Sequence, residues 1–314
     1  MRALVAGGAG FIGSHLCSAL LEKGHSVICV DDLSRGRKES IGQLLENDLF
    51  VFYCLDISRL EDLKRIFEKE KPDYVFHLVA NSDIQASAAN PEIEYRCTYT
   101  TTFNLLQCVK MSGIKKFFFA STSAVYGDKK GIELREDTPE LSPVSYYGAA
   151  KLGSEALISA YSYMDGLQAL IFRFPNVVGP GLTHGVIYDF IRKLEENPAE
   201  LEILGDGTQT KPYMYVDDLV KAILFVMESG KDGVSLYNLG TDGCTSVTKI
   251  ADILCEEMDL RNVTYHYTGG KTGWKGDVSR FRYCLDKIHS AGWKAQYNSD
   301  EAVRMTIRHE LGKM

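Results

Sequence analysis

Hydrophobic residues follow two alternating patterns over the first half of the chain. Short continuous apolar runs occupy residues 3–6, 26–30, 50–55, 74–79, 116–120 and 167–172. Runs of this length without alternation are typical of strands that are buried on both faces. Helical spacing of apolar residues occupies the intervals 12–23, 60–70, 92–111 and 147–163. This succession predicts an α/β fold, in which a doubly wound parallel (Rossmann) sheet carries helices on both faces.

The pattern becomes less regular after residue 174, where prolines and glycines interrupt it. It predicts helices over 186–196 and 217–228, a glycine-rich turn at 205–207 and a strand over 235–239. We expect a cofactor-binding domain of residues 1–175 plus about 216–245. A smaller C-terminal substrate-binding lobe would comprise about 176–215 plus 246–314, so that the two domains are interleaved along the chain.

Composition narrows the class of protein. The 314 residues are 45% hydrophobic and 25% charged, which is ordinary globular usage and excludes a disordered or collagen-like chain. A net charge of −7 gives no broad positive surface for nucleic acid, and no apolar stretch has the length of a membrane span. The eight cysteines are scattered and form no C-x-x-C pair, which favours free thiols in a reducing compartment. We therefore expect a cytoplasmic protein without nucleic-acid or membrane partners.

A glycine-rich segment directly follows the first predicted strand. Gly7, Gly10 and Gly13 stand at three-residue spacing, and Phe11 and Ile12 open the next helix. Such glycines can mark a plain tight turn. Between a strand and a helix, however, they let the backbone approach a pyrophosphate at the positive end of the helix dipole. The position therefore favours a dinucleotide-binding loop.

The second predicted strand ends at Asp31, where a carboxylate can accept hydrogen bonds from the adenosine ribose hydroxyls. Arg35 and Arg37 follow and would suit the 2′-phosphate of NADP, but the acid lies nearer to the strand end. We therefore expect NAD.

The third predicted strand ends close to Asp56 and Ile57, which are candidates for contact with the adenine. A helix N-cap at Asp56 or Ser58 is the alternative interpretation.

Tyr147 and Lys151 are four residues apart on a predicted helix, so both side chains leave the same face. Thr122 follows the fifth predicted strand. A tyrosine is a poor base because its reference pKa is about 10. An ammonium group roughly 4 Å away would lower that pKa by about three units, so the pair predicts a tyrosine base that is active near neutral pH.

Together these features resemble the extended short-chain dehydrogenase/reductases, and specifically their nucleotide-sugar epimerase and dehydratase group, typified by UDP-glucose 4-epimerase. The similarity extends over nearly the whole chain and includes residues 7–13, 31–36, 76–80, 121–127, 147–151, 173–180, 205–207 and 215–218.

The resemblance implies a role for each matching residue. Tyr147 would be the base, Lys151 would hold the nicotinamide ribose, and Thr122 would bind the reacting sugar hydroxyl. Leu78 and Ala80 would lie beside the cofactor. The residues expected to bind the nucleotide sugar are Asn176, His184, Lys211 and Asp277. The resemblance also implies a homodimer that pairs through the helices at 92–111 and 147–163.

Departures from the family pattern decide between its reactions. The family's dehydratases commonly place Asp-Glu directly after the catalytic threonine, whereas this chain has Ser123 and Ala124. Elimination would lack its usual acid/base partner, which favours epimerisation. Lys211 and Trp274 stand where arginines are usual, with Lys275 adjacent, so the nucleobase stays open. The usual Asn-x-x-Gly-Thr segment reads Thr98-Tyr99-Thr100-Thr101-Thr102.

The sequence thus predicts an NAD-dependent nucleotide-sugar 4-epimerase that acts on a UDP-hexose. A dehydratase of the same group is the first alternative, and a non-catalytic dinucleotide-binding regulator is the second. We expect no metal site, because His77 and His184 have no further ligand at metal-binding spacing.

Overall fold

The computed structural model describes residues 1–81, 84–228, 232–273 and 276–313, so Trp274 and Lys275 lie outside the described residues. The chain divides into two compact units, each made of three segments. The first unit comprises Met1–Val125, Ser145–Arg173 and Ile223–Tyr237, and the second comprises Tyr126–Val144, Phe174–Ala222 and Asn238–Met314.

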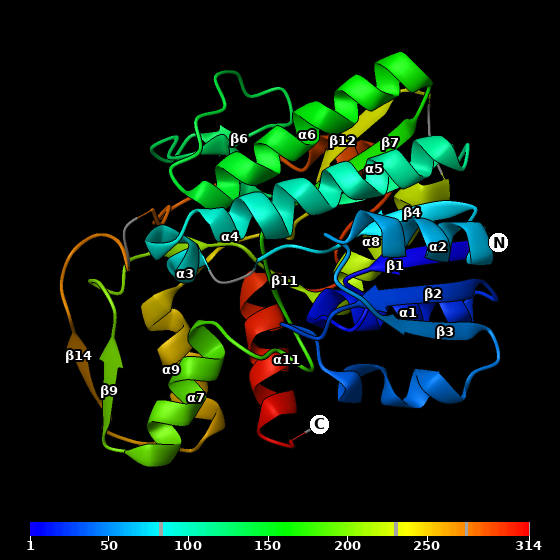
Figure 1. Cartoon of the computed structure of the whole chain (residues 1–314). Helices are drawn as coiled ribbons and strands as arrows, with labels where there is room; N and C mark the ends of the chain where they lie inside the picture. Colours follow the sequence, from blue (N-terminus) through cyan, green and yellow to red (C-terminus); the bar gives the residue numbers. More distant parts are fainter. Residues whose placement is uncertain (82–83, 229–231, 274–275, 314) are drawn as a thin grey trace. The chain divides into compact units, whose positions relative to one another are not determined.

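The first unit is built on a seven-stranded sheet (Figure 1). Its strands are β1 (Arg2–Ala6), β2 (Ser26–Asp31), β3 (Phe50–Cys54), β4 (Tyr74–His77), β5 (Lys116–Thr122), β7 (Gln168–Phe174) and β12 (Val234–Asn238). Their order is β12-β7-β5-β4-β1-β2-β3, and β1 pairs in parallel with both β2 and β4. The winding direction reverses at β1, and ligands of open α/β sheets bind beyond the carboxyl ends of the strands at such a point. The predicted doubly wound parallel sheet is confirmed.

Helices cover both faces of this sheet. Those of the first unit are α1 (Phe11–Glu22), η1 (Lys38–Glu46), α2 (Leu60–Glu70), α3 (Ile84–Ala89), α4 (Glu92–Glu94), η2 (Tyr95–Thr100), α5 (Thr101–Met111) and α6 (Tyr146–Asp165), followed by the short η3 (Ser123–Tyr126) and by α8 (Val216–Glu228), which cross into the second unit. Helix α5 contacts both α2 and α6, and the three share one hydrophobic core with alternate strand residues such as Leu4, Val75 and Phe117. On the other face, Cys17 of α1 lies against Gly8 and Cys29. None of the described helices is both long and apolar enough to cross a membrane.

The helix predicted over residues 92–111 is confirmed, but its middle is π-helical rather than α-helical. Helix α4 passes into η2, a π-helix, before α5 begins. The hydroxyl of Thr101 donates to the carbonyl of Cys97 at 2.8 Å, and that of Thr102 donates to the carbonyl of Thr98 at 2.8 Å. Threonine side chains that bond back to the preceding turn disturb regular α-helix geometry, and π-helical segments often occur at functional sites.

The second unit packs three helices around a core of its own. Its helices are α7 (Val186–Glu196), α9 (Val247–Glu257), α10 (Asp286–Ser290) and α11 (Ser299–Glu310), and its strands are β6 (Glu133–Leu134), β8 (Asn176–Val178), β9 (Glu200–Ile203), β10 (Thr210–Lys211), β11 (Tyr213–Tyr215), β13 (Thr245–Ser246), β14 (Thr264–Tyr267) and β15 (Arg282–Tyr283). Apolar residues of α7, α9 and α11 form the core with β9. Helix α11 begins with a capping box, in which Asn298 and Glu301 satisfy each other's backbone N–H groups.

The glycine turn between β1 and α1 is closely packed. Gly7 has a φ of +83°, which residues with side chains rarely adopt. A Cβ at Gly13 would lie 2.1 Å from the carbonyl oxygen of Gly7 and 2.7 Å from the Cα of Gly8. The first turn of α1 therefore lies directly against the loop, and both neighbouring atoms belong to backbone that cannot rotate away.

We predict that Gly13→Ala lowers the free energy of unfolding by about 1–3 kcal/mol, because the added methyl group overpacks this turn. Gly42→Ala is the matched control, since a Cβ at Gly42 in η1 meets no heavy atom within 4 Å. Urea denaturation of both variants measures the difference. Equal free energies of unfolding for the two variants would contradict the close packing of the turn.

Candidate active site

Asp31 ties the end of β2 to the glycine turn. Its Oδ2 accepts a hydrogen bond from the N–H of Ala9 at 3.0 Å, and its Oδ1 accepts one from the N–H of Leu33 at 2.9 Å. Burial raises the pKa of Asp31, while these backbone donors oppose the rise. Each carboxylate oxygen can accept more than one hydrogen bond. Asp31 thus fixes the loop and keeps acceptor capacity for ribose hydroxyls at the switch point.

Asp56 lies just beyond β3 and is not a helix cap. It accepts a hydrogen bond from the N–H of Ser58 at 2.9 Å and pairs with Arg96 at 3.3 Å. Helix α2 begins after Arg59, so the N-cap interpretation of Asp56 or Ser58 is wrong: the Asp56 side chain closes a two-residue turn instead. The amide of Asn104 holds the carbonyls of Ile57 and Ser58, which fixes the segment predicted to meet the adenine.

The segment after β4 lies against the glycine turn. A Cβ at Gly7 would stand 3.0 Å from the carbonyl carbon of Leu78 and 3.0 Å from the nitrogen of Val79. Leu78 donates its N–H to the carbonyl of Ala6 at 2.9 Å, and Leu78 and Ala80 are partly exposed. The ends of β1, β2 and β4 therefore form a shallow wall of backbone around the start of α1. That wall, with the acid of Asp31, fits the pyrophosphate and ribose of a dinucleotide.

Tyr147 and Thr122 meet where β5 ends and α6 begins. Ser145 caps α6 by accepting the N–H of Gly148 at 3.1 Å, which places Tyr147 in the first turn of the helix. Thr122 is the last residue of β5, and its hydroxyl is hydrogen-bonded to that of Tyr147. Two residues 25 positions apart in sequence are thus brought together, as the resemblance implied.

Lys151 lies one turn further along α6 and is 1% exposed. Its Nζ donates to the carbonyl oxygen of Ala120 at 2.6 Å and lies 4.6 Å from the centre of the Phe119 ring. Burial lowers the pKa of Lys151 to about 7, although the charges of Glu94 and Glu155 oppose the change. The side chain is therefore held rigidly against β5, on the helix face that carries Tyr147.

The expected lowering of the tyrosine pKa is wrong for the chain by itself. Burial raises the pKa of Tyr147 to about 12, the charge of Glu94 adds to the rise, and the hydrogen bond with Thr122 opposes it. The expected lowering of the Tyr147 pKa requires a full ammonium charge beside the phenol. Lys151 is itself buried, however, and its own pKa is lowered, so it loses its proton easily. Activation of Tyr147 thus needs a further positive charge or a change in its surroundings.

Sequence reasoning missed a buried ion pair behind these residues. Glu155 binds Arg173 through two hydrogen bonds, at 3.0 and 2.6 Å, and also accepts the hydroxyl of Ser121. This pair ties α6 to β7 and to the end of β5 next to Thr122. The signal was present, because Glu155 stands four residues after Lys151 on the same helix face.

The two positions after Thr122 carry no carboxylate. Ser123 and Ala124 begin η3, and the N–H of Ala124 donates to the hydroxyl of Thr122 at 3.2 Å. This contact restricts the threonine side chain but offers no acid or base for a second proton transfer.

The residues predicted to bind a nucleotide sugar belong to the second unit. Asn176 opens β8 and is hydrogen-bonded to Tyr213, its partner on β11. Lys211 pairs with Asp277 at 2.5 Å, and both side chains are largely buried. His184 is exposed in the loop before α7 and contacts Thr183 at 3.1 Å. The ammonium group of Lys211 and the carboxylate of Asp277 therefore form an ion pair with each other.

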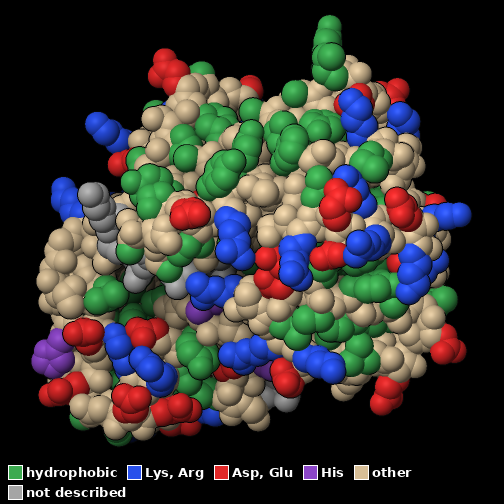
Figure 2. All heavy atoms as spheres, viewed as in Figure 1, with side chains coloured by type: hydrophobic (Ala, Val, Ile, Leu, Met, Phe, Trp, Pro, Cys, Tyr) green, Lys and Arg blue, Asp and Glu red, His purple; other side chains and the backbone are tan. Residues whose placement is uncertain are grey.

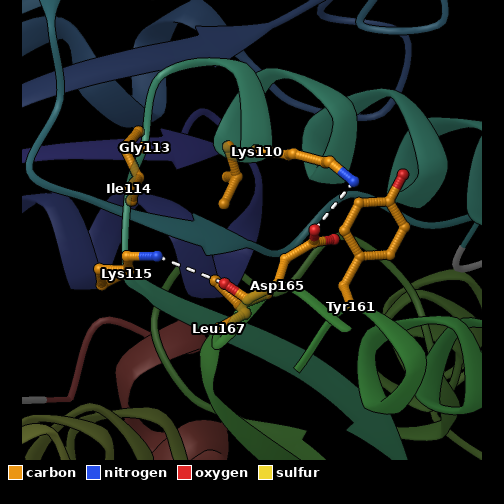
Figure 3. A pocket seen from close by; sticks show the side chains of 8 residues that line it. Lys110, Gly113, Ile114, Lys115, Tyr161, Asp165 and Leu167 are labelled. Carbon is orange, nitrogen blue, oxygen red and sulfur yellow. Dashed lines mark hydrogen bonds and ion pairs between the residues drawn. The ribbon is translucent and has the colours of Figure 1, made fainter. Parts of the chain in front are cut away.

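Two hollows lie away from these residues. One, of about 270 Å³, is lined by residues of α5, α6 and the loop before β5, where Lys110 pairs with Asp165 at 2.8 Å and the Tyr161 ring lies beside them (Figure 3). It lies at the amino end of β5, the opposite edge from Thr122. The other, of about 640 Å³, lies in the second unit beside Thr241 and His289. Across the described parts of the chain, no three His, Cys, Asp or Glu side chains gather as a metal would require.

Comparison with known proteins agrees with this arrangement. The family model described as "NAD dependent epimerase/dehydratase family" matches residues 3–240. The UDP-glucose 4-epimerase of Mycolicibacterium smegmatis is 34% identical over 98% of this chain and 97% of its own, and the dTDP-D-glucose 4,6-dehydratase of Homo sapiens is 30% identical over 98% and 89%. The crystal structure of UDP-glucuronic acid 4-epimerase from Bacillus cereus, in complex with UDP-glucuronic acid and NAD, is 26% identical and covers 100% of both chains with a TM-score of 0.90.

These matches span both units and include the glycine turn, Asp31, Thr122, Tyr147 and Lys151. The cofactor is NAD, as Asp31 indicated, and the resemblance drawn from the sequence is confirmed. The chain belongs to the NAD dependent epimerase/dehydratase family.

Proposed function

We propose that this protein is a nucleotide-sugar 4-epimerase that uses NAD to invert the C4 hydroxyl of a UDP-hexose. The hydrogen-bonded pair of Tyr147 and Thr122, beside the buried Lys151, is the observation that carries the proposal. A non-catalytic regulator would not need a phenol, a hydroxyl and an ammonium group arranged for proton transfer. The M. smegmatis and B. cereus relatives are named as epimerases of UDP-sugars, which supports the same substrate class.

The cofactor would lie along the ends of β1, β2 and β4. We assign its contacts to Gly7, Gly10, Phe11, Ile12, Gly13, Asp31, Asp56, Ile57, Leu78, Ala80, Tyr147 and Lys151. NAD bound there would supply the acceptor and donor for the C4 hydride, and its positive charge would favour the phenolate of Tyr147.

The catalytic residues of the chain move one proton. Thr122 holds the C4 hydroxyl, and Tyr147 removes its proton as the carbonyl forms. Lys151 supplies positive charge beside the phenolate and positions the cofactor ribose. After the 4-keto sugar turns over in its pocket, Tyr147 returns the proton to the oxygen on the opposite face of C4. No net oxidation results, so the cofactor stays bound through turnover.

The nucleotide sugar would contact the second unit through Asn176, His184, Lys211 and Asp277. In the structure Lys211 pairs with Asp277 rather than standing unpaired. We infer that a diphosphate competes with Asp277 for the Lys211 ammonium group. A lysine pairs with phosphate as a point charge and lacks the bidentate fork of an arginine.

We further propose that the protein works in the cytoplasm as a homodimer that pairs through α5 and α6. Hydrophobic side chains gather in the upper part of the view in Figure 2, where these helices lie in Figure 1. The large exposed apolar residues of α5 and α6 are Phe103, Met111, Tyr146, Tyr163 and Met164. Exposed apolar side chains on neighbouring helices are typical of a protein–protein interface.

The choice between epimerase and dehydratase is tested by turnover of UDP-glucose in heavy water, because its C6 hydroxyl is the group that a dehydratase would eliminate. An epimerase breaks only the C4–H bond and returns its hydride, so we expect the C4 epimer without deuterium at C5 and without loss of water. Elimination across C5 and C6 would need a base for the C5 proton, which neither Ser123 nor Ala124 provides. Mass spectrometry and proton NMR of the product measure both signatures. Deuterium at C5, or a product lighter by one water, would show a dehydratase instead.

Replacing Tyr147 should remove most of the epimerase activity and leave binding of the nucleotide sugar nearly unchanged. We expect Tyr147→Phe to reduce kcat by about a hundredfold or more, because the phenol acts mainly in the transition state. KM for the nucleotide sugar should change only a few-fold. Steady-state kinetics of the purified variant give both values. A variant that keeps more than about a tenth of the wild-type kcat would exclude Tyr147 as the base.

The proposed homodimer interface is tested by placing a negative charge on the exposed apolar face of α5. Phe103→Glu should convert the dimer to a monomer, since a buried unpaired carboxylate opposes association by several kcal/mol. Leu45→Glu is the matched control, because Leu45 and Phe103 are both 41% exposed and Leu45 lies on η1, away from α5 and α6. Light scattering gives the mass of each. A monomeric wild type, or equal masses for both variants, would overturn the proposed interface.

A further inference from the structure

A second buried carboxylate lies close to the catalytic pair and has no role so far. Glu94 is the last residue of α4 and is 1% exposed. Its Oε1 accepts a hydrogen bond from the amide of Asn81 at 2.9 Å, and its Oε2 accepts one from the hydroxyl of Thr98 at 2.8 Å. Both donors are neutral, so they orient the carboxylate without cancelling its charge. Burying a charge is costly, and it persists where the surroundings use it.

The segment that carries Glu94 packs on the catalytic helix. Both α4 and η2 contact α6. A Cβ at Gly153 of α6 would lie 3.3 Å from the Tyr99 ring of η2, so the glycine permits this close approach. The π-helical turn sets Thr98 where its hydroxyl reaches Glu94 while Thr102 bonds back to the carbonyl of Thr98. The irregular helix therefore holds the carboxylate against α6.

The charge of Glu94 acts on both catalytic groups. It raises the pKa of Lys151 against the dominant effect of burial, and it adds to burial in raising the pKa of Tyr147. Glu155 also raises the pKa of Lys151, but its own charge is met by Arg173. The other titratable and charged groups around Glu94 and Lys151 are His77 on β4, Arg96 and Cys97 on η2, Glu155 on α6 and Arg173 on β7.

We propose that Glu94 is a positioning residue whose buried carboxylate favours the ammonium form of Lys151 beside Tyr147. The inference deepens the proposed function, because it assumes that this pair performs the proton transfer. Lys151 needs its proton to stabilise the phenolate, so its contribution is present at low pH and is lost as the pH rises through its pKa. Tyr147 acts as the phenolate, so its contribution is lost as the pH falls through its pKa. Glu94 raises both pKa values, so loss of its charge should move both titrations to lower pH.

The direct test is the titration of Lys151 itself. The full-length protein is labelled with ¹³C at the lysine Cε, and the Lys151 signal is assigned by its absence from Lys151→Met. We expect Glu94→Gln to lower the titration midpoint of Lys151 by about one pH unit, the size of effect typical of a nearby charge. Glu92→Gln makes the same change on the exposed side of α4 and should leave the midpoint unmoved. An unchanged midpoint in Glu94→Gln would overturn the proposal.

The pH dependence of kcat/KM is the second readout. Loss of the negative charge should move the acidic and alkaline limbs of the Glu94→Gln profile together to lower pH. A purely structural role would reduce the rate at every pH and leave both limbs in place, which would count against the proposal. Should Glu94→Gln fail to fold, Glu94→Asp keeps the charge and must keep the midpoint within a few tenths of a unit. A fall of a full unit in that variant would exclude the charge as the cause.

The proposed function and the proposed role of Glu94 can be disproved independently of each other. If the protein does not epimerise a UDP-hexose, the proposed function is wrong, yet the NMR midpoint of Lys151 still decides the role of Glu94. If the midpoint does not move while epimerisation is observed, only the role of Glu94 is wrong.

Discussion

The structure of the site depends on the burial of one ammonium group. Lys151 is enclosed between α6 and β5, where its Nζ has the carbonyl of Ala120 as a hydrogen-bond acceptor. Removing a positive charge from water is unfavourable by several kcal/mol, which is why burial lowers the pKa of Lys151 to about 7. The neighbouring carboxylates of Glu94 and Glu155 oppose this shift. Burial thus favours release of the Lys151 proton, and the two carboxylates act in the opposite direction.

The irregular helix after Glu94 takes part in the hydrogen bonds around this site. The segment that reads Thr98 to Thr102, where the family usually has Asn-x-x-Gly-Thr, forms a π-helix followed by the first turn of α5. Its hydroxyls bond to backbone carbonyls, to Glu94 and to the ring of His77. Burial and the charge of Lys151 both lower the pKa of His77, which keeps this histidine neutral. The polar residues between α5, α6 and the sheet therefore form one connected network of hydrogen bonds that includes Glu94.

The cofactor end of the site follows a different principle. Gly7 and Gly13 remove side chains so that backbone lies against backbone, and Asp31 accepts N–H groups from the loop that it stabilises. At the other end, burial raises the pKa of Tyr147, the proposed base, to about 12. The chain by itself thus positions this phenol without activating it.

The sequence by itself determined the strands of the large sheet, the glycine turn, the acid at the end of β2 and the Tyr147–Lys151 pair. Each of these depends on local spacing, and local spacing is set by the periods of helices and strands. It did not determine the π-helical segment after Glu94, because a π-helix arises from competing hydrogen bonds that do not change the hydrophobic period.

The tertiary structure alone decided the electrostatics. Spacing along α6 places Lys151 beside Tyr147. Only the fold shows that burial lowers the pKa of Lys151 and that the charge of Glu94, 57 positions earlier in the chain, opposes this lowering. The pairing of Glu155 with Arg173 and of Lys211 with Asp277 likewise joins residues that are distant in the chain. Charge interactions depend on distance and burial in space, and neither quantity can be read from sequence order.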